Sequence, residues 1–209
     1  MNFKGVKMLR ERLFKDGVLT IDEAHEILSP HYTDIMGCIN EGLNKVGELR
    51  QNQPEFYIPL TPRSRASIIH DHIESEAKRI FGVKNTEIVV YTEKGFLVID
   101  FSKRVFLRFK KLRRNLMPCN IETEQQKAFD EQTLFGGPVT HVTAGYRLNG
   151  SGIYRDAHIV CWSCGELLWS LRLPDIEVGS RSDITVTPSI APSSVVVRKI
   201  ATSKVADGS

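Results

Sequence analysis

The chain has 209 residues, of which 41% are hydrophobic and 25% are charged, and its formal net charge is only +3. These values are ordinary for a soluble globular protein. No apolar run approaches the roughly 18 residues of a membrane-spanning helix, so we expect no membrane association. Residues 1–17 contain acidic side chains and no continuous apolar stretch, and the four cysteines are too dispersed for a disulfide framework. Composition therefore predicts a reduced, cytoplasmic protein.

Residues 1–52 are predicted to form a helical N-terminal segment. Apolar residues repeat at helical spacing over 8–14. Thr20 and Glu23 have the spacing of a capping box, which predicts a short helix through Leu28.

A third helix is predicted after Pro30, because apolar residues recur at helical spacing over 35–49. Three glycines at intervals of five weaken this helix: Gly37, Gly42 and Gly47. They indicate either close packing against another helix or a segment that is only marginally stable without a partner.

Residues 53–61 are predicted to be an extended connector, because they contain two prolines. The strongest helix follows over 62–81, with Thr61 as its cap and Pro62 in its first turn. Its apolar stripe consists of Ile69, Ile73, Ala77 and Ile80.

From residue 87 the hydrophobic period changes from 3.6 to two. Three strands are predicted at 87–93, 95–101 and 104–111, then a short helix over 123–134, then further strands through 173. The turns between strands are too short for crossover helices, which favours a mainly antiparallel sheet. The predicted fold class is α+β, with a core domain over 56–174.

The last part of the chain, 175–209, is predicted to be a flexible tail. Ser, Thr and Pro make up twelve of the residues in 180–209, and no useful period is present.

A dense group of cations follows the second of these strands. We call it the basic ribbon; its members are Lys103, Arg104, Arg108, Lys110, Lys111, Arg113 and Arg114. Seven cations in twelve residues contrast with the small net charge and predict contact with nucleic acid or an acidic protein partner. Phenylalanines interleave with the cations, as in proteins that bind single strands. The alternative is a solvated strand face.

The element order over 62–148 resembles the PD-(D/E)xK nuclease core. The resemblance implies a Mg²⁺-dependent nuclease that uses Glu76 of the first helix, Asp100 of the second strand and Lys110 of the third. The third strand carries Arg108 where this family has a glutamate, and an arginine does not ligate Mg²⁺. The alternative is that Glu76 and Asp100 pair with Arg108 or Lys110.

Cys161 and Cys164 form a Cys-x-x-Cys pattern, which resembles half of a zinc ribbon. No second half exists. His158 lies three residues before Cys161, and the distant candidate ligands are Cys119 and His141. A hairpin tip between two tryptophans and a redox pair are the alternatives. We expect reduced cysteines and no zinc or other cofactor.

His70 and Glu74 lie one helical turn apart on the predicted helix. This spacing allows them to share a proton or a metal, although a solvated helix face is the expected setting.

Three segments, FYIPLTPRSRASIIHDHI, VFLRFKKL and HVTAGYRL, resemble uncharacterised bacterial proteins encoded on mobile elements. The resemblance implies a toxin–antitoxin or phage-defence setting. Three hypotheses follow: a component that binds nucleic acid or a protein partner, a divergent metal-dependent nuclease, and a toxin subunit neutralised by a cognate partner protein.

Overall fold

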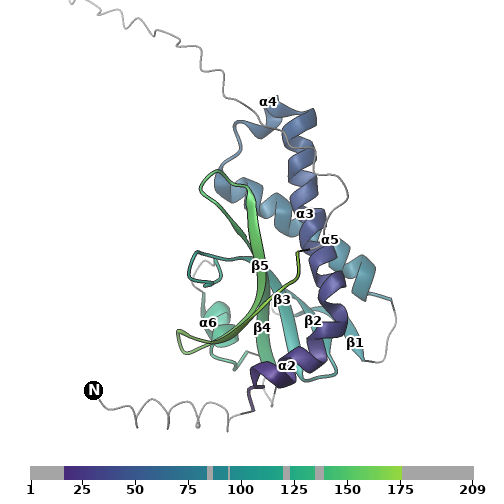
Figure 1. The fold of residues 1–209 in the computed structure, drawn as a ribbon, viewed down its shortest axis with the longest axis vertical. Helices are drawn as coiled ribbons and strands as arrows, with labels where there is room; N and C mark the ends of the chain where they lie inside the picture. The colour runs from purple at the N-terminus through teal and green to yellow at the C-terminus, as the bar shows by residue number, and fades with distance from the viewer. Residues whose placement is uncertain (1–16, 84–86, 94, 120–122, 135–138, 176–209) are drawn as a thin grey trace, which may run out of the picture. The chain divides into compact units, whose positions relative to one another are not determined.

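The computed structural model describes residues 17–83, 87–93, 95–119, 123–134 and 139–175 (Figure 1). The chain divides into two units, Met1–Ile176 and Glu177–Ser209, and every described residue lies in the first. The helix predicted over 8–14 and nearly all of the predicted tail lie outside the described residues.

Helices α2 (Ile21–Leu28), α3 (Tyr32–Asn52) and α5 (Pro62–Phe81) confirm three predicted helices. A 3₁₀ turn, Ser29–His31, joins the first two. The capping box is present, since Thr20 and Glu23 each accept the other's backbone N–H. None of the helices in the described part of the chain is long and apolar enough to cross a membrane.

The connector is not extended as predicted, because it contains helix α4 (Pro54–Tyr57). Proline is tolerated in a first helical turn, where its missing N–H has no partner to lose. The centre of the Tyr57 ring lies 4.2 Å from the guanidinium carbon of Arg65 and 5.9 Å from that of Arg50. These cation–π contacts tie the connector to α5 and to the end of α3.

Six strands form one sheet in the order β1-β2-β3-β4-β5-β6. Their bounds are β1 Ile88–Glu93, β2 Phe96–Phe101, β3 Val105–Lys111, β4 Thr140–Leu148, β5 Tyr154–Ser163 and β6 Glu166–Arg172. All neighbours are antiparallel except β3 and β4, which are parallel. The predicted α+β class with a mainly antiparallel sheet is therefore confirmed.

The short helix predicted over 123–134 is confirmed, although it ends at Asp130, and it lies in a crossover connection that the sequence analysis did not predict. Parallel neighbours need a connection that returns to the starting edge. Residues 112–139 make this connection, and they carry helix α6 (Glu124–Asp130), capped by Thr123. This crossover brings α6 onto the sheet.

The helices cover both faces of the sheet: α3 and α5 lie on one side and α6 on the other (Figure 1). Alternate residues of β2 and β3 point into the core with α2, α3 and α5, as the period of two requires. These residues are Leu97, Ile99, Phe101, Val105, Leu107 and Phe109. Ile35 and Ile39 of α3 belong to the same core, so the N-terminal helices are packed onto the sheet.

Helices α3 and α5 approach closely at Gly42. A Cβ atom there would lie 2.5 Å from the Ile69 carbonyl oxygen and 2.7 Å from Cγ1 of Ile73, too close for any side chain. A Cβ atom at Gly47, five residues later in the same helix, would have no neighbouring atom within 4 Å. Of the two explanations for the glycines, close helix packing therefore applies at Gly42.

Candidate functional site

Strands β2 and β3 diverge at the end where β3 finishes. Their ladder covers only three residue pairs, from Phe101 opposite Val105 to Ile99 opposite Leu107. Strand β3 nevertheless stays paired with β4 as far as Lys111. The sheet therefore opens between the start of β2 and the end of β3, and we call this gap the sheet opening.

A cavity of about 610 Å³ lies at the sheet opening. Its walls come from the first half of α5, the start of β2, the end of β3 with the loop that follows, the start of α6, and β4. The lining residues are Pro62, Arg63, Ala66, Ser67, His70, Ile73, Phe96, Lys110, Lys111, Arg113, Cys119, Thr123, Gln126 and Tyr146. The cavity adjoins the carboxyl ends of two parallel strands, the usual place for a ligand site in sheets with crossover helices.

The lining of this cavity is cationic. Its described residues include Arg63, Lys110, Lys111 and Arg113 and no aspartate or glutamate. Among the described residues, no carboxylate forms an ion pair with any of these four side chains. Arg63 also lies in the first turn of a 20-residue helix, whose N-terminus carries partial positive charge. The cavity is therefore a place where an anion would be stabilised.

Lys110 is the most enclosed of the four cations. Burial lowers the pKa of its ammonium group, and the nearby charge of Arg108 lowers it further, while Glu74 opposes the shift. The predicted pair of His70 and Glu74 is confirmed, with Nε2 of the imidazole 3.1 Å from the carboxylate. The hydrogen bond from His70 lowers the pKa of Glu74. His70 belongs to the cavity lining and Glu74 does not, and both side chains remain about 30% exposed.

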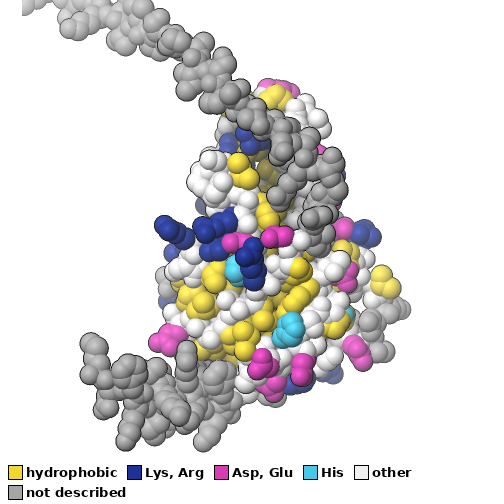
Figure 2. Space-filling model, in the orientation of Figure 1, with side chains coloured by type: hydrophobic (Ala, Val, Ile, Leu, Met, Phe, Trp, Pro, Cys, Tyr) yellow, Lys and Arg dark blue, Asp and Glu magenta, His cyan; other side chains and the backbone are white. Residues whose placement is uncertain are grey.

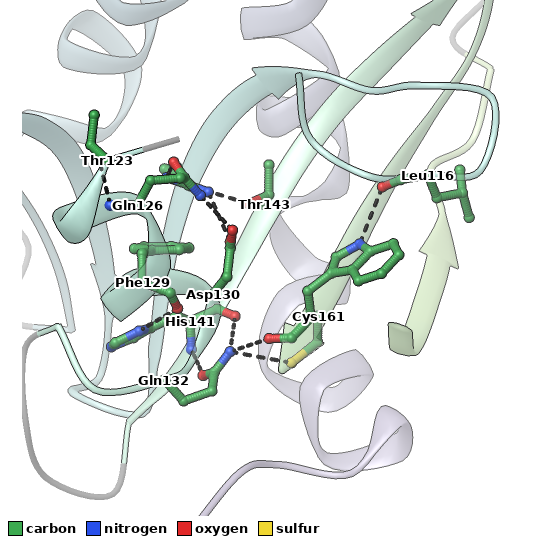
Figure 3. Close-up of polar contacts among 11 residues, drawn as sticks. Leu116, Thr123, Gln126, Phe129, Asp130, Gln132, His141, Thr143 and Cys161 are labelled. Carbon is green, nitrogen blue, oxygen red and sulfur yellow. Dashed lines mark hydrogen bonds and ion pairs between the residues drawn. The ribbon is translucent and has the colours of Figure 1, made fainter. Parts of the chain in front are cut away.

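Arg108 does not face a ligand, contrary to the prediction for the basic ribbon. Its side chain is 2% exposed. Its guanidinium donates hydrogen bonds to Thr143 at 3.2 Å, Gln126 at 2.6 Å and Asp130 at 3.2 Å. Figure 3 shows Gln126 and Asp130 of α6 pointing toward Thr143 on β4. Burial lowers the pKa of Arg108 to about 10.

The partner of this buried arginine differs from the predicted one. We expected Arg108 to pair with Glu76 or Asp100, and it pairs with Asp130 instead. The Phe129 ring completes the contact, with its centre 3.8 Å from the guanidinium carbon. Arg108 therefore fixes α6 to the sheet.

The basic ribbon is not one continuous surface. Lys103 and Arg104 lie in the turn between β2 and β3, where Arg104 is 3.9 Å from Glu23 of α2. Arg113 and Arg114 are exposed beyond the other end of β3. A strand advances about 3.3 Å per residue, so the two ends of the seven-residue β3 lie about 20 Å apart. On the face drawn in Figure 2, Lys and Arg side chains likewise form separate groups.

The three residues that the nuclease resemblance implies are placed apart. Both oxygens of Glu76 accept hydrogen bonds from Arg79, at 2.7 and 2.6 Å. Asp100 accepts from the backbone N–H of Lys103 at 2.7 Å, in the turn at the other end of β3. Only Lys110 lines the cavity. Within the described ranges, no group of three or more His, Cys, Asp or Glu side chains is arranged to hold a metal ion.

The Cys-x-x-Cys pattern lies at a hairpin tip, as one of the alternatives held. Cys164 and Gly165 form the turn between β5 and β6 with positive φ angles of 48° and 79°. Cys161 is buried, which raises the pKa of its thiol, whereas Cys164 is exposed. All four cysteines are free, and the exposed Cys119 belongs to the cavity lining.

Sequence reasoning missed the parts of the cavity that come from distant segments. Arg63, Cys119, Thr123 and Tyr146 carry no local pattern that links them. Only the position of Arg63 at a helix start was a signal for anion binding.

Comparison of the chain with family models, curated proteins and solved structures finds no match.

Proposed function

We propose that the protein binds nucleic acid at the cationic cavity of the sheet opening. One observation carries this proposal: Arg63 of α5 and Lys110, Lys111 and Arg113 of β3 and its loop converge on a cavity, and none of its described lining residues is a carboxylate. Phosphate groups are the most common ligands of such clusters, and backbone phosphates supply most of the affinity of proteins for nucleic acids.

The apolar walls of the cavity support a single strand over a duplex. Phe96, Ile73 and Tyr146 offer apolar and aromatic surface next to the cations. Proteins that bind single strands combine a positive groove with aromatic side chains on which bases stack. A duplex keeps its bases inside the helix, whereas a single strand is free to place a base in a cavity. An acidic protein segment would gain less from this combination.

The sequence resemblance to proteins of bacterial mobile elements supports a cytoplasmic toxin–antitoxin or phage-defence setting for this binding. The nuclease alternative gains no support from geometry, because Glu76 and Asp100 are engaged elsewhere and no carboxylate is among the cavity's described lining residues. We therefore propose binding and assign no reaction.

A paired substitution within the basic ribbon tests the proposal. K111Q/R113Q removes two cations beside the cavity, and K103Q/R104Q removes two from the opposite end of β3. Fluorescence anisotropy with single-stranded DNA, single-stranded RNA and duplex DNA measures the affinity of each protein. We expect K111Q/R113Q to bind single strands roughly tenfold more weakly and the control to match the wild type. Equal loss in both variants, or no binding by the wild type at low salt, would reject the proposal.

A further inference from the structure

One polar group in the lining of the cationic cavity has no partner in the described part of the protein. Tyr146 of β4 lines the cavity and is only 2% exposed. Within the described ranges, no residue forms a hydrogen bond with its hydroxyl. Nearly all buried polar groups in proteins have such a bond, because little water is there to replace it. The unpaired hydroxyl therefore points to a ligand that supplies the missing bond.

The hydroxyl of Tyr146 is close to other residues of the cavity lining. Burial raises the pKa of Tyr146, and the thiol of Cys119, which also lines the cavity, raises it further. Lys111, a third lining residue, lies directly opposite Tyr146 in the parallel ladder of β3 and β4. Residues paired in this way point to the same face of a sheet. At neutral pH the phenol is uncharged, so its hydroxyl both donates and accepts hydrogen bonds.

The surroundings of this hydroxyl fit a base better than a phosphate. Ile73 is buried and Phe96 is half-buried, and both line the cavity. Arg63 and Arg113 are instead exposed, and a phosphate binds there without losing all of its hydration. A base has apolar faces and a polar edge, so it suits an apolar wall that carries one hydroxyl. We infer that the cavity binds one unstacked base of the strand and that Tyr146 hydrogen-bonds to the edge of this base, an inference that rests on the proposed function.

This contact makes the affinity depend on the base. The cavity volume of about 610 Å³ lies in the range of sites for nucleotide-sized ligands. A base whose edge complements the Tyr146 hydroxyl forms the bond, whereas another base leaves both groups unpaired in a site that excludes water. Phosphate contacts carry no base information. The preference among bases therefore depends on Tyr146, and the salt-dependent part of the affinity depends on the cations.

The test titrates the full-length chain with oligo-dA, oligo-dC and oligo-dT, each of about ten nucleotides. We expect the tightest and the weakest of these to differ roughly tenfold in affinity for the wild type, and Tyr146→Phe to reduce that ratio to roughly twofold. Tyr91→Phe, which changes a tyrosine of β1 outside the described cavity lining, should keep the wild-type ratio. An unchanged ratio in Tyr146→Phe would overturn the inference, and the proposed function would stand if K111Q/R113Q still weakens binding of all three. No binding of any strand by the wild type would reject both.

An abasic strand of the same length separates a base from a phosphate as the partner of the hydroxyl. Tyr146→Phe should weaken binding of the preferred homopolymer and not that of the abasic strand. Equal weakening of both would assign the hydroxyl to a phosphate and contradict the inference. Thermal unfolding of the free protein gives an independent answer, because removal of an unpaired hydroxyl should not lower stability. A less stable Tyr146→Phe would show that the hydroxyl is already paired within the protein and would also contradict the inference.

Discussion

Arg108 and Asp130 form an ion pair of 3.2 Å across the interface between β3 and α6. The pair joins a strand to the crossover helix that leads to β4. Arg108, the central cation of the basic ribbon, therefore stabilises the fold. Arg104 lies 3.9 Å from Glu23, whereas Lys110, Lys111 and Arg113 form no ion pair with any described carboxylate.

Removal of Arg108 should be strongly destabilising. Arg108→Met leaves Asp130 with only the hydrogen bond from Gln126, at 2.7 Å, and no compensating cation. Breaking a buried ion pair from one side costs about 3 kcal/mol of unfolding free energy or more. Urea denaturation measures this loss. The double variant R108M/D130N should lose less than the sum of the two single variants, because the second change removes the uncompensated charge. Arg104→Met, which removes an exposed pair with Glu23, should leave stability nearly unchanged. A near-neutral R108M would show that the network does not stabilise the fold.

Two glycines of α3 should respond oppositely to the same substitution. Gly42→Ala forces a Cβ against the backbone of Ile69, so it should separate α3 from α5 and cost about 2 kcal/mol or more. Gly47→Ala meets no atom within 4 Å and should stabilise the helix by about 0.5–1 kcal/mol. Thermal or urea unfolding of both variants checks the pair. A tolerated Gly42→Ala would contradict the close approach of the two helices.

Stability should fall between about pH 6.5 and pH 4 because of His141. Burial lowers the pKa of this imidazole from its ordinary 6.5 to about 4. In this pH window the unfolded chain binds a proton at His141 while the folded protein does not. The contribution of His141 to the free energy of unfolding is therefore complete above pH 6.5 and decreases as the pH falls. The shift corresponds to a contribution of about 3 kcal/mol. Unfolding free energies measured across the window should decline less steeply in His141→Gln. Some decline should persist, because burial also lowers the pKa of His158. An unchanged slope in the variant would rule out His141 as its source.

Cys119 should report on occupation of the cavity. It is exposed and lies with Lys110, Lys111 and Arg113, so an anionic thiol reagent should modify it faster than Cys164, which is exposed at the hairpin tip. A single-stranded oligonucleotide should slow the reaction of Cys119 and leave that of Cys164 unchanged. Peptide mapping by mass spectrometry separates the two sites. Equal protection of both cysteines, or protection of neither, would disagree with the proposed location of the ligand.

Local sequence patterns predict the elements of this fold well, because helix caps and hydrophobic periods depend on nearby residues. Thr20 and Thr61 cap their helices as predicted. The parallel pairing of β3 with β4 was missed, since strand partners depend on contacts across residues 112–139 that no local period encodes.

The site was predictable only in part for a geometric reason. The sequence places Lys103 and Lys110 in one cationic run, but a strand carries them to opposite ends. Its alternation of faces also buries Arg108 under α6. Arg63, which completes the cavity, comes from a helix more than forty residues earlier in the chain.

The salt dependence of single-strand binding tests the central claim most directly. Each phosphate contacted contributes a slope of about −0.7 to the plot of log affinity against log salt concentration. Four cavity cations predict a wild-type slope of about −3, reduced to about −1.5 in K111Q/R113Q and unchanged in K103Q/R104Q. A wild-type slope near zero, or the same reduction in both variants, would contradict the claim that the cavity of the sheet opening is where phosphate is bound.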